Sequence, residues 1–226
     1  MSVRVRQTLL LAAPVIRIVP WVPVAAATVV SVLTLLPALT GAPAPASQIW
    51  GVRIAAVVLG AGASFALVDP MAPLSVTPTP RWLRQWLRVA VVLVPITAVW
   101  AGLYLAAAAS LDSARLPSRD LTVEAAVCGL TGLAGAAVAA RSGHSLTLAV
   151  AGPAAQGGLM VATLFLPAGF SAWPLPDSPQ WERVHDWWLP MLPVLVVSLV
   201  LANRELWPWR RRKPALVDAR DLVRAR

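Results

Sequence analysis

The chain has 226 residues, of which 58% are hydrophobic and only 13% are charged, and its mean hydropathy is +0.70. A soluble domain carries about 25% charged residues, so this composition excludes an ordinary soluble enzyme or binding domain. Several apolar runs reach the roughly 20 residues that are needed to cross about 30 Å of hydrocarbon. The sequence therefore predicts an all-α integral membrane protein.

The formal net charge of +9 would suggest a nucleic-acid partner in a soluble protein. Here the basic residues gather at the ends of apolar runs and in the tail, without the basic face and interleaved aromatics that a nucleic-acid groove needs. We expect membrane lipids as a partner and no nucleic acid. Cys128 is the only cysteine and lies inside an apolar run, which excludes an intramolecular disulfide and a cysteine-rich metal site.

Residues 1–20 predict an amphipathic segment that lies along the cytoplasmic membrane surface. A signal peptide fits less well, because the apolar core Leu9–Ile16 is short, is interrupted by Pro14 and has no clean cleavage site after it. The leucines of this segment would face the lipid. Its basic residues, directed towards the headgroups, are Arg4, Arg6 and Arg17.

Six apolar runs predict a six-helix transmembrane domain over residues 21–205, followed by a basic cytoplasmic tail over 206–226. Small residues in the second and fourth runs, Gly60 and Gly132 among them, predict close helix packing in lipid. The expected spans are about 21–39, 49–68, 89–109, 121–140, 146–166 and 187–202.

The longest connection on the far side of the membrane covers residues 170–186. Its second half, from Pro179, predicts a short interfacial helix that precedes the sixth span. Tryptophan is enriched at membrane interfaces, and Trp181, Trp187 and Trp188 would anchor this helix.

The distribution of basic residues predicts the orientation. With both termini in the cytoplasm, the inner side collects fifteen of the nineteen basic residues, and the outer side keeps Arg53, Arg115, Arg119 and Arg183. This bias agrees with the positive-inside rule and favours a multi-pass protein with both termini inside. The inner set is Arg4, Arg6, Arg17, Arg81, Arg84, Arg88, Arg141 and the eight basic residues from Arg204 onward.

The sequence does not predict an enzyme. A phosphate-binding loop that ends in Gly-Lys-Ser/Thr is excluded, because the sole lysine is Lys213 in the tail. Ser142 and His144 are close in sequence, but His144 and His185 are both expected in loops on opposite sides of the membrane. We therefore expect no catalytic residue and no metal site, and an intramembrane enzyme is the weakest hypothesis.

The span interiors offer hydroxyl and amide groups rather than a proton relay. Arg53, Glu124 and Arg141 all fall near span ends, and Arg53, in the first turn of its span, can extend its side chain to the surface. The polar residues could line a cargo pathway, or they could simply join neighbouring helices. The candidates are Thr28, Ser31, Thr34, Gln156 and Thr163.

The connection between the second and third spans is the main internal loop, and it has two interpretations. Trp82 and Trp86 alternate with Arg84 and Arg88 at helical i, i+4 spacing, which is typical of a helix anchored at the interface. The prolines before them stiffen the loop and would make it a docking feature for a soluble subunit. The residues of this loop are Asp69, Pro70, Thr77, Pro78, Thr79, Pro80 and Arg81.

Two stretches carry a resemblance to a known family. The pattern Ser-Phe-Ala-Leu-x-Asp-Pro over 64–70, followed by Thr-Pro-Thr-Pro-Arg over 77–81, resembles actinobacterial ABC transporter permeases of the type-2 exporter class. The outer string Trp-Pro-Leu-Pro-Asp-Ser-Pro-Gln-Trp over 173–181 is similar to the same group. Its candidate residues are Trp173, Asp177, Trp181 and His185.

The resemblance implies a permease subunit of an ATP-driven exporter in a bacterial plasma membrane. Such a subunit pairs with a second permease copy or a homologous permease, and docks two ABC-type ATP-binding subunits that hold ATP and Mg; this chain itself would bind no cofactor. By position, the ATPase would contact residues 2–17 and 69–81. The cargo would be hydrophobic or amphipathic, such as a peptide, an antibiotic or a lipid-like molecule. The alternative is a non-transporting membrane scaffold or immunity protein that binds a partner.

Overall fold

The computed structural model describes residues 14–40, 44–68, 81–111, 116–141, 145–167 and 170–204. All regular structure in these ranges is helical, which confirms the predicted all-α class. Residues 14–18 form a short helical turn before the first long helix. The elements that follow are α2 (Trp21–Thr40), α3 (Pro45–Ser64), the 3₁₀ turn η1 (Phe65–Leu67), α4 (Arg81–Ser110), α5 (Ser118–Ala139), α6 (Ser145–Leu164) and α7 (Trp181–Asn203).

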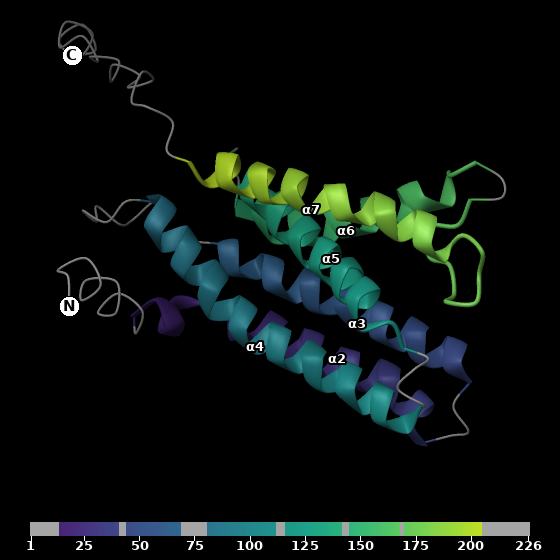
Figure 1. Cartoon of the computed structure of the whole chain (residues 1–226). Helices are drawn as coiled ribbons and strands as arrows, with labels where there is room; N and C mark the ends of the chain where they lie inside the picture. The colour runs from purple at the N-terminus through teal and green to yellow at the C-terminus, as the bar shows by residue number, and fades with distance from the viewer. Residues whose placement is uncertain are drawn as a thin grey trace, which may run out of the picture.

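The helices form one bundle in which successive helices run in opposite directions (Figure 1). We name its two ends by their charge. At the basic end α2 begins and α7 ends, and this end carries Arg17, Arg84, Arg88, Arg141 and Arg204. At the acidic end α2 ends and α7 begins, and all acidic side chains of the described residues lie there, namely Asp120, Glu124, Asp177, Glu182 and Asp186.

Helices α3 and α5 form the centre of the bundle. They pack against each other, α2 and α4 pack on α3, and α6 and α7 pack on α5. The central contact depends on glycine: a Cβ added at Gly132 would lie 2.8 Å from the backbone oxygen of Gly60. Small residues were expected to allow close helix packing, and the structure shows that they do so where these two helices meet.

Two helices differ from the predicted spans. Helix α4 begins at Arg81, two turns before the predicted start near residue 89. The short interfacial helix predicted from Pro179 does not stand apart, because residues from Trp181 onward belong to the single helix α7. Val184 and Trp188 pack against α5, which fixes the first turns of α7 in line with the rest.

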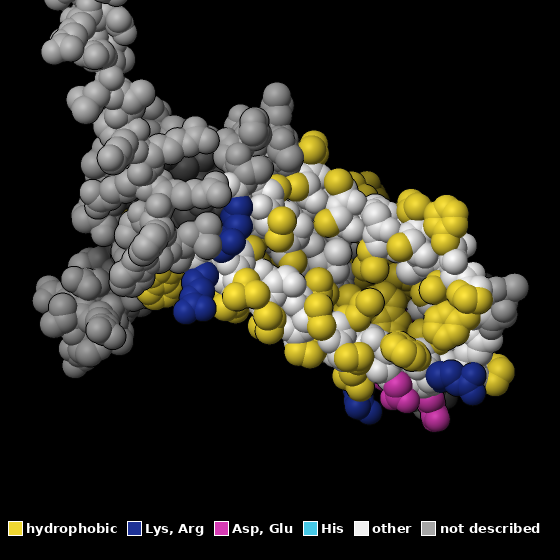
Figure 2. All heavy atoms as spheres, turned by 90° about the horizontal axis from the view of Figure 1, so that it is seen from above, with side chains coloured by type: hydrophobic (Ala, Val, Ile, Leu, Met, Phe, Trp, Pro, Cys, Tyr) yellow, Lys and Arg dark blue, Asp and Glu magenta, His cyan; other side chains and the backbone are white. Residues whose placement is uncertain are grey.

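Four helical segments are long and apolar enough to cross a membrane: Pro45–Leu67, Trp82–Ser110, Ser118–Ala139 and Trp181–Asn203. The segments Trp21–Pro37 and Val150–Leu164 are apolar but shorter. Large hydrophobic side chains also cover the outside, and Val22 and Leu164 are each 80% exposed. On the face shown in Figure 2, hydrophobic side chains are spread along the bundle among uncharged groups, and the charged side chains lie toward its two ends. These features are compatible with a transmembrane protein.

Candidate functional site

Three ionisable side chains from three helices meet in the interior near the acidic end. Arg53 of α3, Glu124 of α5 and His185 of α7 are only 3%, 2% and 5% exposed. Charges buried in a bundle of this kind are costly unless they are paired, and within a membrane protein they are functional candidates by default. We call these three residues the charge cluster.

The Arg53 guanidinium and the Glu124 carboxylate form a paired, two-point contact. Arg53 Nε donates to Glu124 Oε2 and Nη2 donates to Oε1, both at 2.7 Å. Nη2 also donates to the carbonyl of Pro174 at 2.8 Å, and Nη1 to the carbonyl of Trp173 at 3.2 Å. The guanidinium thus joins α3 to α5 and to the connection that precedes α7.

His185 adds α7 to the same pair. Its Nε2 lies 2.9 Å from Glu124 Oε1 and its Nδ1 lies 2.8 Å from the carbonyl oxygen of Trp181. A carbonyl oxygen only accepts hydrogen bonds, and so does a carboxylate oxygen paired with arginine. A ring that carries hydrogen on both nitrogens therefore satisfies both partners. Glu124 Oε1 is the atom on which α3 and α7 converge.

Tryptophan rings enclose the cluster. The centroids of Trp50, Trp173 and Trp181 lie 5.4, 5.6 and 5.7 Å from Arg53 Cζ, within the range of cation–π attraction. The ring of Trp181 also lies 4.1 Å from that of His185, and its Nε1 donates to Asp120 Oδ2 at 2.7 Å. These rings cover the ion pair and stabilise the guanidinium of Arg53.

The local sequence explains why these side chains meet. On α5, Asp120 and Glu124 are four residues apart and share one helical face. On α7, Trp181 and His185 have the same spacing and face α5. Arg53 lies in the third turn of α3, at a comparable distance from the acidic end.

A cavity reaches the cluster from the acidic end. It has a volume of about 360 Å³, and His185 and Trp181 form part of its wall. Asp120, Glu182 and Asp186 outnumber Arg119 in its wall, so the cavity is acidic on balance. The charge cluster is thus buried, and its His185 borders a cavity between the first turns of α5 and α7.

Two predictions about single residues are wrong. Arg53 does not extend to the surface; its pairing with Glu124 retains it in the interior. His185 does not lie in a loop, because it belongs to the second turn of α7. Sequence reasoning missed the cluster since it treated each charge near a span end singly. The signal was the equal depth of Arg53 and Glu124 in two neighbouring helices.

The outer residues that the family resemblance suggested are partly brought together. Trp173, Trp181 and His185 surround the ion pair. Asp177 is exposed and lines a different cavity, of about 780 Å³, between the start of α3 and the connection before α7.

The five residues suggested for a cargo pathway lie on two helices and bond mainly within them. Thr28, Ser31 and Thr34 of α2 donate to carbonyls of their own helix, and Ser31 also approaches the carbonyl of Ala55. On α6, Gln156 donates to the carbonyl of Cys128 at 2.8 Å. Thr163 accepts from Trp173 Nε1 and donates within α6. The pathway stays a prediction.

Most residues of the predicted partner-binding region lie outside the described residues. At its margins, Arg81 is the first residue of α4, and Arg17 is exposed at the basic end. The residues outside are Arg4, Arg6, Asp69, Pro70, Thr77, Pro78, Thr79 and Pro80, as well as Ser142 and His144.

Comparisons with protein-family models, with curated proteins and with solved structures find no match for this chain.

Proposed function

We propose that the chain is the membrane-spanning permease subunit of an ATP-driven ABC exporter. It would cross a bacterial plasma membrane six times and move a hydrophobic or amphipathic cargo, such as a peptide, an antibiotic or a lipid-like molecule. ATP and Mg would bind to separate ATP-binding subunits, and a second permease copy or a homologous permease would complete the transporter. The resemblance of residues 64–81 motivates this proposal, and the packing at the basic end supports it.

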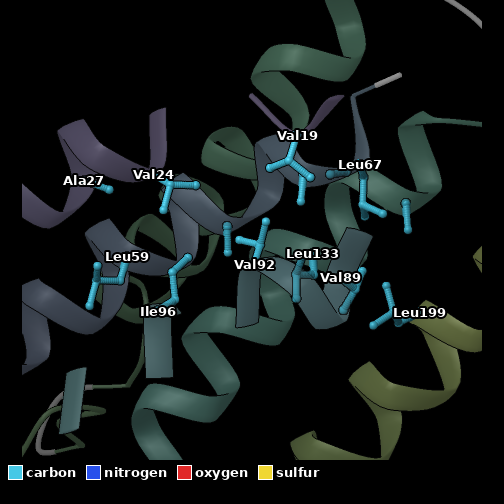
Figure 3. Packing of buried hydrophobic residues seen from close by; sticks show 14 of the residues in the cluster. Val19, Val24, Ala27, Leu59, Leu67, Val89, Val92, Ile96, Leu133 and Leu199 are labelled. Atoms are coloured by element: carbon cyan, nitrogen blue, oxygen red, sulfur yellow. The ribbon is translucent and has the colours of Figure 1, made fainter. Parts of the chain in front are cut away.

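The observation that carries the proposal is a hydrophobic cluster at the basic end (Figure 3). Val15 and Val19, which precede α2, are 7% and 4% exposed and share this cluster with Leu67 and Val89. Leu67 ends η1 and Val89 lies in α4, so they flank the connection over residues 69–80. The segment before α2 and both ends of this connection therefore form one packed unit.

A hydrogen bond closes the same unit. Arg88 Nη1 of α4 donates to the carbonyl of Val68 at 3.0 Å. This hydrogen bond joins the residue that follows α3 and η1 to the first turns of α4. A soluble subunit that presses on the intervening connection would act on α3 and α4 together. The tight contact of α3 with α5 would carry such a displacement into the other half of the bundle.

The charge distribution supports a cytoplasmic basic end. Basic residues predominate at this end, whereas the acidic side chains of the described residues lie at the other. By the positive-inside rule, the 69–80 connection would then be in the cytoplasm, where an ATP-binding subunit is available. The acidic end, with the charge cluster, would face outwards.

The mechanism requires a partner that distinguishes two states of the bundle. A ligand shifts a conformational equilibrium only by the difference in its affinity for the two states. We expect the ATP-bound partner to prefer one arrangement of the Val19–Leu67–Val89 unit and the ADP-bound partner another. This difference would supply the work of transport.

The test is co-purification of the solubilised protein with its native ATP-binding subunits. A variant with residues 69–80 replaced by Gly and Ser residues should lose an ATPase that the wild type retains. The control variant replaces the connection over 112–115 at the acidic end in the same way and should retain it. If no ATPase accompanies the wild type, the exporter is excluded and the membrane scaffold or immunity protein becomes the better interpretation.

A further inference from the structure

The charge cluster lies at the end of the bundle opposite the region proposed for coupling, so coupling alone gives it no role. We propose that Arg53, Glu124 and His185 form a latch that holds the acidic end of the bundle closed, and that its release opens the interior between α3, α5 and α7. Only the identity of what drives the release rests on the proposed function. The latch itself is a property of this chain.

The latch links two helices, α3 and α7, that are otherwise joined mainly through α5. Helices α3 and α7 both pack extensively on α5 and little on each other, apart from Trp181, which shares a buried cluster with Ile49 and Val52. At the acidic end they are linked through Glu124, which takes hydrogen bonds from Arg53 on one side and faces His185 on the other. Loss of the Glu124 contacts would remove this polar link and weaken the hold of α3 on α7 at the acidic end.

The connection before α7 belongs to the same closure. Arg53 donates to the carbonyls of Trp173 and Pro174, and Trp188 Nε1 of α7 donates to the carbonyl of Ala172 at 3.3 Å. The segment 172–174 is thus held by α3 and α7 at once. Movement of α7 away from α3 would pull residues 172–174 away from Arg53 and so uncover the charge cluster.

Buried ion pairs suit a device that must both close and open. The cost of removing two charges from water nearly offsets their attraction, so the paired and the hydrated states differ little in free energy. The acidic cavity beside His185 supplies the water that an opened cluster would need. The aromatic rings around Arg53 favour the closed state.

The interior next to the latch, around Cys128, contains a polar atom that water could pair with. Cys128 lies one turn beyond Glu124 on α5 and is 1% exposed. Its carbonyl accepts from Gln156 Nε2, whereas Gln156 Oε1 is buried and has no hydrogen-bond partner among the described residues. An unpaired buried oxygen is costly, and it gains a partner when water enters. Water that enters between α3, α5 and α7 when the latch opens would reach Cys128 and could pair with Gln156 Oε1 beside it.

Cys128 is the only cysteine of the chain and provides a direct reporter. We expect a membrane-impermeant maleimide to leave Cys128 unmodified in wild-type proteoliposomes that contain no other protein. The Glu124→Gln variant removes the charge that holds both neighbours, and its Cys128 should be modified at least tenfold faster. Thr122→Gln, an exposed position on the same helix, is the matched control and should behave as wild type.

A second reporter separates opening of one end from unfolding. Ala137 is 1% exposed near the basic end of α5. In a Cys128→Ala background, a cysteine introduced as Ala137→Cys should stay unmodified when Glu124→Gln is added. Modification of both cysteines would mean that the cluster only stabilises the fold, and the latch would be rejected. Protection of Cys128 in a folded Glu124→Gln variant would reject it equally.

A milder variant serves if Glu124→Gln does not fold. His185→Asn keeps the Arg53–Glu124 pair intact and removes only the ring that ties α7 to it. Modification of Cys128 should then rise by a smaller factor while the Ala137→Cys site stays protected. No rise would overturn the latch. Neither experiment involves an ATPase, so a failed latch and a failed exporter proposal give different results.

Discussion

Gly132 on α5 lies directly against the backbone of Gly60 on α3: an added Cβ would come within 2.8 Å of the Gly60 carbonyl oxygen. A backbone atom cannot move aside as a flexible side chain can. We predict that Gly132→Ala lowers the free energy of unfolding by about 1–3 kcal/mol through overpacking. The measurement is thermal unfolding of the purified protein in detergent.

Gly129, one turn earlier on α5, provides the control for this prediction. A Cβ at Gly129 would meet nothing within 4 Å. Gly129→Ala should be neutral, or should stabilise by up to about 1 kcal/mol from the better helix propensity of alanine. If both variants unfold at the same temperature, the close approach of α3 and α5 is not as described.

The Arg53–Glu124 ion pair predicts that removing one charge costs more stability than removing both. Glu124→Gln alone leaves the Arg53 guanidinium buried without an anion, and we expect it to destabilise by roughly 3–5 kcal/mol. The double variant Arg53→Met with Glu124→Gln removes both charges, and should recover most of this loss. Thermal unfolding of the two variants and the wild type decides. A double variant as unstable as the single one would show that packing, not charge, holds this site.

Trp181 combines a ring contact and a hydrogen bond that mutation can separate. Trp181→Phe keeps an aromatic ring beside His185 but removes the 2.7 Å bond from Nε1 to Asp120. We expect a loss of roughly 1.5–3 kcal/mol, because the acceptor is charged. Trp187→Phe on the same helix should have a small effect, since Trp187 is 67% exposed. Equal shifts in unfolding temperature for the two variants would contradict this assignment.

The sequence was sufficient to predict the all-α class and the approximate positions of the long helices, because apolar runs of span length have a composition that soluble folds lack. It was insufficient for the charge cluster. Arg53 near a span end reads as a residue that reaches the surface, and only the position of Glu124 on a neighbouring helix retains it in the interior. Likewise, the tryptophans that follow Pro179 suggested a separate interfacial helix, whereas packing of Val184 and Trp188 on α5 makes α7 continuous.

Arg141 braces the other end of α7. Its Nε donates to the carbonyl of Ala202 at 2.9 Å, and Nη2 donates to the carbonyls of Leu201 and Arg204. Carbonyls in the last turn of a helix lack intrahelical partners, so a cation here also opposes the negative end of the helix dipole. Arg141→Ala should speed amide hydrogen exchange over residues 199–203. Arg183→Ala, an exposed change at the start of α7, should leave that exchange unchanged.

The packed unit at the basic end yields a prediction that links stability to coupling. Val19 is 4% exposed against the cluster that contains Leu67 and Val89, and Val19→Ala would loosen the segment before α2 from both ends of the 69–80 connection. If the chain couples to an ATP-binding subunit, this variant should still retain the subunit but stimulate its ATP hydrolysis less than wild type does. Val22→Ala changes a side chain that is 80% exposed and should stimulate normally. Undiminished stimulation by Val19→Ala would show that this unit does not transmit the partner's movement.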